Sequence, residues 1–402
     1  MNLSRQQLLI ALCVILAALS VYLYITRKSG ALPVATTHNI ASTTETTSAA
    51  KAGGTVPSVP GGEGSLSTHS GAGASASTPA LTGKLAPELV RPGGFSNSDP
   101  FQLKDFKGQK VVLLQFWTTS SEESAHTIPY LTDWYGKYKN YGLVIVGVHT
   151  PRFQFERSKS TVDDYARLHN ISYPLVIDNG AETWHAYKNN YWPHTYLIDM
   201  TGRIVYEKKG EGGYQVLEEK IQSLLKERAA KLRGAALPEN KLTTFTGIPL
   251  DPSQRVSVEG FFGAQKNTNL ANGTARKEGT QSFASISEPK LGMSYLFGSW
   301  NISSEFASNM TEHDSLIYRY HGKVAYVLAG AKSLRVKVLL DGKPLTQVNA
   351  GKDIQFEKGE SVIYPGNIRL YEIVNDRAGY GDHSIELVPA SGGFSIYSLV
   401  FN

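Results

Sequence analysis

The sequence contains almost no cysteine. Among its 402 residues the only one is Cys13, which lies inside an apolar segment near the amino terminus. Outside that segment the chain cannot form a disulfide, a zinc knuckle or a reactive pair of thiols from its own residues. Runs of Lys and Arg are also absent, and the net charge of +5 is small for this length. We therefore expect no nucleic-acid partner.

Metal-binding and hydrolytic motifs are missing too. The histidines are scattered and the acidic residues lack calcium-loop spacing, so we expect no metal and no cofactor. A calcium site built from backbone carbonyls in the C-terminal region stays open. A nucleophilic Ser121 would need a base, but His126 lies on another face of the same predicted helix. His149 is predicted to be a hydrogen-bonded structural histidine.

The longest apolar run is Leu8–Ile25, with 18 residues. At about 1.5 Å per residue it nearly crosses a hydrocarbon core of roughly 30 Å, so residues 8–26 are predicted to be a transmembrane signal anchor after a short tail, 1–7. A cleavable signal peptide is the alternative, but its apolar region would be only about 7–15 residues. Arg5 on one side and Arg27 and Lys28 on the other leave the orientation undecided.

Two folded regions are predicted beyond the anchor. Residues 27–86 are rich in Ser, Thr, Gly and Pro, which predicts a disordered linker. Residues 87–232 alternate apolar strands with helices and predict an α/β domain with a mixed central sheet flanked by helices. The predicted strands are 110–117, 142–149, 173–178, 195–199 and 203–210, and the predicted helices are 120–141, 160–170, 183–188 and 215–232.

After a second linker, 233–252, the helical periodicity disappears. Residues 253–402 show short alternating runs between Gly, Asp and Asn turns, which predict an antiparallel, jelly-roll-like all-β sandwich. Asp341–Gly342 is predicted to be a two-residue hairpin turn.

Several segments carry a family resemblance. They are FWTTSSEESAHTIPYL, GLVIVGVHTPRFQFE, YPLVIDNGAETWHAY and NNYWPHTYLID, followed by GFFGAQKNTNLANG, FGSWNISSEF, KVLLDGKPL and RLYEIV. In this order they resemble the thioredoxin-like domain of DipZ-type cytochrome c biogenesis proteins, within the TlpA-like group, and the β-sandwich that follows it. That sandwich is similar in architecture to a carbohydrate-binding module. The resemblance implies a redoxin fold displayed outside the cytoplasm.

The dithiol motif of the family is degenerate here. Ser121 and Ser124 occupy the Cys-x-x-Cys positions, and a serine hydroxyl neither forms a disulfide nor ionises near neutral pH. Glu122 and Glu123 stand between them, where the positive end of the helix dipole favours anions. Ser120 with Glu123 also fits a capping box.

Gln115, on the preceding strand, replaces a buried acid that many relatives use to move protons. Engineered replacement of two cysteines would not explain Gln115 or the two inserted acids. We therefore interpret the pattern as natural loss of redox function.

Two candidate binding surfaces remain. Pro193 occupies the cis-proline position of the family, and with Trp117 and Trp192 it is predicted to line a peptide groove, unless the three residues serve only packing.

In the sandwich, Trp300 and Tyr371 are the candidate glycan platform, with Tyr295, Tyr364 and Tyr380 as further aromatics. The alternative is that these rings fill the core.

The sequence thus predicts a membrane-anchored protein with extracytoplasmic domains that bind a peptide, a protein partner or a glycan without catalysis. Two alternatives stay open: a thiol–disulfide oxidoreductase role in envelope redox homeostasis or cytochrome c biogenesis that uses a partner's cysteines, and a purely structural envelope protein.

Overall fold

The computed structural model describes residues 81–237, 242–244, 253–284, 286 and 288–402. The predicted anchor, residues 8–26, and most of the predicted first linker lie outside these residues. Within the described part of the chain, no helix is both long and apolar enough to cross a bilayer. All described residues belong to one compact unit, Ser58–Asn402.

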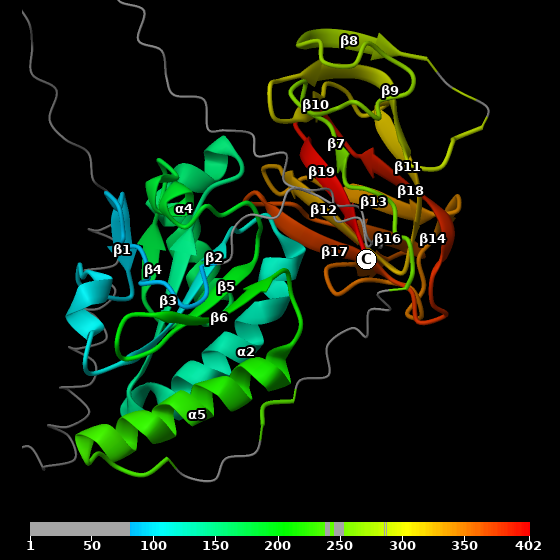
Figure 1. The fold of residues 1–402 in the computed structure, drawn as a ribbon. Coiled ribbons are helices and arrows are strands. Elements are labelled where there is room, and N and C mark those ends of the chain that lie inside the picture. Colours follow the sequence, from blue (N-terminus) through cyan, green and yellow to red (C-terminus); the bar gives the residue numbers. More distant parts are fainter. Residues whose placement is uncertain (1–80, 238–241, 245–252, 285, 287) are drawn as a thin grey trace, which may run out of the picture. The chain divides into compact units, whose positions relative to one another are not determined.

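The first domain is a six-stranded mixed sheet with helices on both faces (Figure 1). Its strand order is β1-β4-β3-β2-β5-β6, in which β2, β3 and β4 are parallel and β1, β5 and β6 pair antiparallel. This confirms the predicted α/β fold. Only β1 was not predicted, because its three residues are too few to show a period. The elements are β1 (Gly94–Ser96), η1 (Leu103–Phe106), β2 (Val111–Trp117), α2 (Glu122–Tyr138), η2 (Lys139–Tyr141), β3 (Leu143–His149), η3 (Gln154–Arg157), α3 (Lys159–Leu168), β4 (Leu175–Ile177), α4 (Glu182–Ala186), β5 (His194–Ile198), β6 (Ile204–Lys209) and α5 (Tyr214–Leu232).

The central strand β2 is buried along its whole length and supplies both faces of the sheet. Successive side chains of a strand point to opposite faces. Leu113 and Trp117 belong to the hydrophobic cluster that includes residues of α2, α3 and α5. Leu114 and Phe116 belong to the cluster that includes Trp184 of α4. Neighbouring residues at the end of β2 therefore serve separate cores.

The second domain is all β, and its ladders are antiparallel. The hydrogen-bonded path runs β15-β16-β13-β18-β11-β9-β10-β19-β12-β17. The Asp341–Gly342 turn joins β13 to β14 with φ of 52° and 74°, as predicted. The strands are β7 (Gly260–Phe261), β8 (Gly279–Phe283), β9 (Met293–Ile302), β10 (Ala307–Asn309), β11 (Ser315–Gly322), β12 (Val324–Gly330), β13 (Val336–Leu340), β14 (Lys343–Pro344), β15 (Gln355–Glu357), β16 (Glu360–Ile363), β17 (Arg369–Asn375), β18 (Gly381–Pro389) and β19 (Ser395–Phe401).

Strand β9 belongs to both layers of this domain. From Gly298 onward it pairs with β8 and β10, whereas Phe297 pairs with Ser315 of β11. Gly298 has φ of +82°, and a Cβ there would lie 2.1 Å from Oδ1 of Asp314. The change of layer therefore requires glycine at this position.

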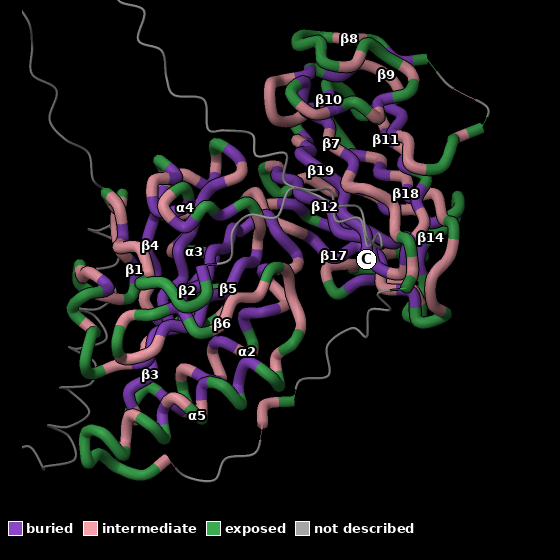
Figure 2. The backbone as a smooth tube through the Cα atoms, in the orientation of Figure 1, coloured by how far each residue is buried: buried purple, intermediate pink, exposed green. Residues whose placement is uncertain are grey.

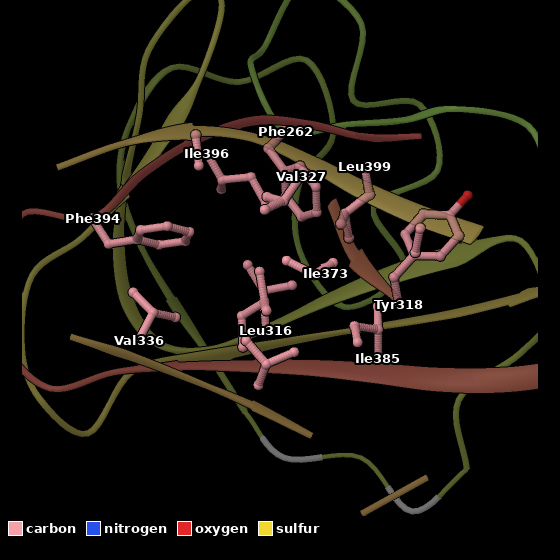
Figure 3. Close-up of a cluster of buried hydrophobic side chains, with 14 of the residues drawn as sticks. Phe262, Leu316, Tyr318, Val327, Val336, Ile373, Ile385, Phe394, Ile396 and Leu399 are labelled. Carbon is pink, nitrogen blue, oxygen red and sulfur yellow. The ribbon is translucent and has the colours of Figure 1, made fainter. Parts of the chain in front are cut away.

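The core of the second domain lies between its two layers (Figure 3). Leu316 and Ile385 come from one layer, and Val327 and Leu399 come from the other. All four side chains are fully buried. Figure 2 shows the same pattern along the backbone, with buried positions concentrated on the strands. Burial of alternate apolar residues on both layers holds the sandwich together.

Candidate functional site

The degenerate motif lies on the short connection between β2 and α2. Ser121 caps α2: its side chain accepts a hydrogen bond from the backbone N–H of Ser124 at 3.1 Å. Both serines are buried, with Ser121 at 7% exposure and Ser124 at 0%. The predicted capping box at Ser120 is wrong, because the backbone N–H of Ser120 instead donates to Glu156 at 2.9 Å.

Glu156 holds the motif loop in place, and the sequence analysis missed it. Its carboxylate is fully buried on η3 and lies under the loop. One oxygen accepts from the hydroxyls of Thr118 at 2.5 Å and Thr119 at 2.7 Å, besides the N–H of Ser120. The other accepts from the N–H groups of Arg152 and Phe153, at 2.7 and 2.9 Å. Five donors thus satisfy a buried charge. A single acid beside two phenylalanines in RFQFE was the only sequence signal.

Gln115 forms a neutral hydrogen-bonded bridge beneath α2. Its amide donates to the hydroxyl of Thr195 at 3.1 Å and accepts from the hydroxyl of Thr127 at 3.1 Å. The residue is buried, which agrees with its predicted place on the central strand. An amide with both groups paired has no proton to exchange with the motif.

The two acids of the motif do not behave as a simple pair of anions. Burial, together with the charges of Glu123 and Glu259, raises the pKa of Glu122 to about 8. Burial and the charge of Glu211 raise the pKa of Glu123 to about 7. We had expected anions at the helix N-terminus; here desolvation outweighs the helix dipole.

His126 lies one turn along α2 from Glu122. Its Nδ1 is 3.0 Å from Glu211 and its Nε2 is 3.2 Å from the hydroxyl of Tyr326. Burial lowers the pKa of His126, but the hydrogen bond with Glu211 and its charge outweigh this effect, so the pKa is raised.

His149 is buried, but the prediction that it is hydrogen-bonded is wrong. Neither ring nitrogen has a partner among the described residues. Its ring packs 5.0 Å from that of Trp117. Burial lowers the pKa of His149 to about 4, against the opposing charge of Glu156, so the ring is neutral.

The β-sandwich covers the surface beside the motif. Arg152, after β3, forms an ion pair with Glu259 and lies over the ring of Phe261. The N–H of Gln154 donates to both carboxylate oxygens of Glu305, at 2.9 and 3.1 Å.

Aromatic packing continues this interface. The rings of Phe153 and Phe155 lie 5.4 and 5.2 Å from that of Tyr397, and Leu328 joins the same cluster. Together with the contact between His126 and Tyr326, these side chains close off the motif side of the first domain.

The three predicted groove residues do not form an exposed groove. Trp117 is buried against His149 and Tyr165, whereas Trp192 belongs to the opposite cluster and stacks on Trp184 at 4.3 Å. Pro193 is buried, and its peptide bond with Trp192 is cis, as the resemblance implied. The groove prediction fails because Trp117 and Trp192 pack in different hydrophobic clusters, and both Trp117 and Pro193 are buried.

The predicted glycan platform is also wrong. Trp300 is fully buried in the sandwich core, where its indole donates to the carbonyl of Phe297 at 2.9 Å. Tyr371 is buried, and the guanidinium of Arg369 covers its ring at 3.7 Å. Of the other candidates, Tyr295 is buried and Tyr380 is half-buried. Only Tyr364 is exposed, at 37%.

Among the described residues no group of His, Cys, Asp and Glu is arranged to hold a metal.

Comparison with known families agrees with the two-domain fold. Residues 82–207 match the AhpC/TSA family, and residues 257–401 match a family described as a thioredoxin-like C-terminal domain. A solution structure of a thioredoxin-like protein in the oxidized form is 26% identical, with a TM-score of 0.33, and covers 36% of this chain and 95% of that chain.

Two curated relatives give the family. Protein DipZ of Mycobacterium tuberculosis (strain CDC 1551 / Oshkosh) is 35% identical over 264 residues, which are 65% of this chain and 37% of that protein. The chain therefore spans well under half of that relative. Thiol-disulfide oxidoreductase ResA of Bacillus thuringiensis subsp. konkukian is 31% identical over 142 residues, which are 35% of this chain and 78% of that protein. The chain belongs to the family of thioredoxin-fold proteins that includes ResA and the matching part of DipZ, and its only cysteine is Cys13.

Proposed function

We propose that the chain is a membrane-anchored, extracytoplasmic binding protein whose thioredoxin-like domain does not catalyse dithiol–disulfide exchange. The observation that carries this proposal is the motif itself, where Ser121 caps α2 and Ser124 is buried. Exchange requires a thiolate that attacks a disulfide and a second thiol that resolves the mixed disulfide. Neither group exists among residues 81–402, since the only cysteine is Cys13.

The environment of the motif supports the same conclusion. An active dithiol needs an electropositive, partly exposed site that lowers the pKa of the attacking thiol. Here Glu122 and Glu123 bring carboxyl groups to that position, and Gln115 replaces the proton-accepting acid. These substitutions favour a rigid structural unit over a reactive one.

The ligand is a peptide, a protein partner or a glycan, bound by weak contacts that membrane tethering would strengthen. In the sandwich, the exposed rings of Phe356 and Tyr364 are better placed for a sugar than the buried Trp300 and Tyr371. Localisation outside the cytoplasm is supported by the family resemblance and by the predicted anchor.

Insulin reduction by dithiothreitol tests the absence of catalysis. The full chain is expected to give the rate of the protein-free background. The double variant Ser121→Cys/Ser124→Cys is the matched comparison, because it restores the motif on the same scaffold. Acceleration by the unmodified chain would overturn the proposal, and acceleration by the double variant alone would support it.

Binding is tested separately on peptide and glycan arrays with the same full chain. Saturable binding to either class is expected. Blank arrays of both kinds would instead favour a purely structural envelope protein.

The similarity to DipZ and ResA favours a second candidate, in which the chain supports a partner that carries an intact Cys-x-x-Cys. In that case the chain would raise the turnover of such a partner while remaining inactive alone. A mixed assay with a purified Cys-x-x-Cys relative distinguishes this role from simple binding.

A further inference from the structure

The contacts beside the motif form a closed interface between two domains of one chain. On the side of the thioredoxin-like domain, His126 and Arg152 reach Tyr326 and Glu259 of the sandwich. The aromatic cluster around Phe153 seals the interface next to these polar contacts. Such an interface leaves little water to solvate a charge, so every ionisable group in it affects closure.

The interface brings together more carboxyl groups than cations. Glu122 is buried, and it interacts electrostatically with Glu123 on its own helix and with Glu259 from the sandwich. His126 and Arg152 are the cations that face it. Glu259 already engages Arg152 and Glu211 already engages His126, so Glu122 forms no ion pair within the described part of the chain.

The surrounding elements add further negative charge. Glu211, before α5, is bonded to His126 and raises the pKa of Glu123. Glu372 of β17 and Glu122 both interact electrostatically with Tyr326 and His126. The charge of Lys208, on β6, acts on Glu123.

We propose that protons bound at Glu122 and His126 hold the sandwich closed over the motif loop, and that losing them at alkaline pH releases it. A neutral Glu122 can stay buried next to Glu259, whereas an ionised one would add an uncompensated charge. A protonated His126 lies between Glu211 and the hydroxyl of Tyr326, and its deprotonation removes one of the few positive charges of the cluster. Both groups therefore favour closure in their protonated forms.

The direction of the pH dependence follows from the raised pKa values of Glu122 and His126. Burial raises the pKa of Glu122 to about 8, and the hydrogen bond with Glu211 raises that of His126. Closure thus takes up protons, so it weakens as the pH rises toward about 8. At acid pH, protonation of His169 weakens closure. Burial and the charges of Lys352 and Arg369 lower the pKa of His169 to about 4. Closure is strongest between these limits.

Energy transfer between two labels tests this inference on the full chain. The background is Cys13→Ala, and the labels are attached through Lys226→Cys on α5 and Leu291→Cys on the sandwich, both at exposed positions. Between about pH 6 and about pH 9.5 the transfer efficiency is expected to fall, with a midpoint near the raised pKa of Glu122. In the Glu122→Gln variant, which cannot ionise, the fall in efficiency is expected to be smaller, because only His126 still loses its proton.

Two further variants keep the result interpretable. Glu278→Gln removes an exposed glutamate of the sandwich and is expected to leave the transition unchanged. Tyr326→Phe removes only the hydroxyl that contacts His126 and is expected to move the midpoint to lower pH. A constant efficiency in the unmodified chain, or an unaltered transition in Glu122→Gln, would overturn the proposal. The transfer efficiency does not depend on whether the protein binds a peptide or a glycan. If the proposed function fails, these measurements still decide whether closure depends on pH.

Discussion

The motif region of the thioredoxin-like domain and the core of the β-sandwich are both buried, but they are built from different chemistry. The cluster between the two layers of the sandwich consists of apolar and aromatic side chains. Around the motif, the buried side chains include Gln115, Glu122, His149 and Glu156. One region is held by apolar burial, and the other by hydrogen bonds to buried polar groups.

This difference shows how the loop between β2 and α2 is held in place without cysteine. The loop keeps its position through Glu156 and the cap of Ser121. Buried polar networks cost much when one member is removed and little when all are satisfied. We therefore expect the two regions to respond differently to the same kinds of substitution.

The largest effect is expected from the sandwich core. Trp300→Ala removes a fully buried ring and should destabilise the sandwich by about 4 kcal/mol, since a large cavity is left. Urea unfolding followed by far-ultraviolet circular dichroism measures the loss. Val348→Ala, at an exposed position, is the control and should change stability by less than about 0.5 kcal/mol. A small loss in Trp300→Ala would mean that the core does not depend on this ring.

A smaller effect is expected from Glu156→Gln. The amide keeps the shape, but it loses the charge that accepts five hydrogen bonds and adds N–H groups that face donors. The expected cost is about 3 kcal/mol. Glu227→Gln, on the exposed surface of α5, is the matched control. Equal stability of the two variants would contradict the role assigned to Glu156.

Glu122→Gln should act in the opposite direction, and only at higher pH. The pKa of Glu122 is raised in the folded protein to about 8, above its ordinary value of 4.5. The stability that its proton contributes is present below about pH 4.5 and is lost as the pH rises through about 8. The glutamine variant should therefore be more stable than the unmodified chain near pH 8, and similar to it near pH 4.5. Thermal unfolding at both pH values measures the difference, and a pH-independent one would refute this assignment.

The smallest effect is expected from the helix cap. Ser121→Ala removes the side-chain acceptor for the N–H of Ser124 and should cost about 1 kcal/mol. Ser223→Ala, on the exposed face of α5, should cost nothing measurable because alanine favours helix. If Ser121→Ala were equally silent, the cap would not contribute to stability.

The sequence predicted the strands and helices of both domains well, because their apolar periods are long and clear. Strands β2 and β3 lie where the apolar runs place them. The Asp341–Gly342 turn was predictable because few residues tolerate two positive φ angles in succession.

The site was less predictable, because side-chain direction depends on long-range packing. Trp117, Trp300 and Tyr371 were chosen for their rings, but a strand pattern does not tell which aromatics face inward. Glu156 gave only a weak signal, since its five donors come from two loops that meet only in the fold. The interface between Tyr326 and His126 joins residues 200 positions apart, a pairing that no local pattern contains.

The passage of β9 from one layer to the other has a mechanical consequence. Because the hydrogen-bonded path crosses between the layers at Gly298, the two layers cannot separate unless the pairing of β9 is lost first. The sandwich should therefore lose its structure in one cooperative step instead of shedding one sheet at a time. A load applied to its C-terminal strand would be carried into both sheets together.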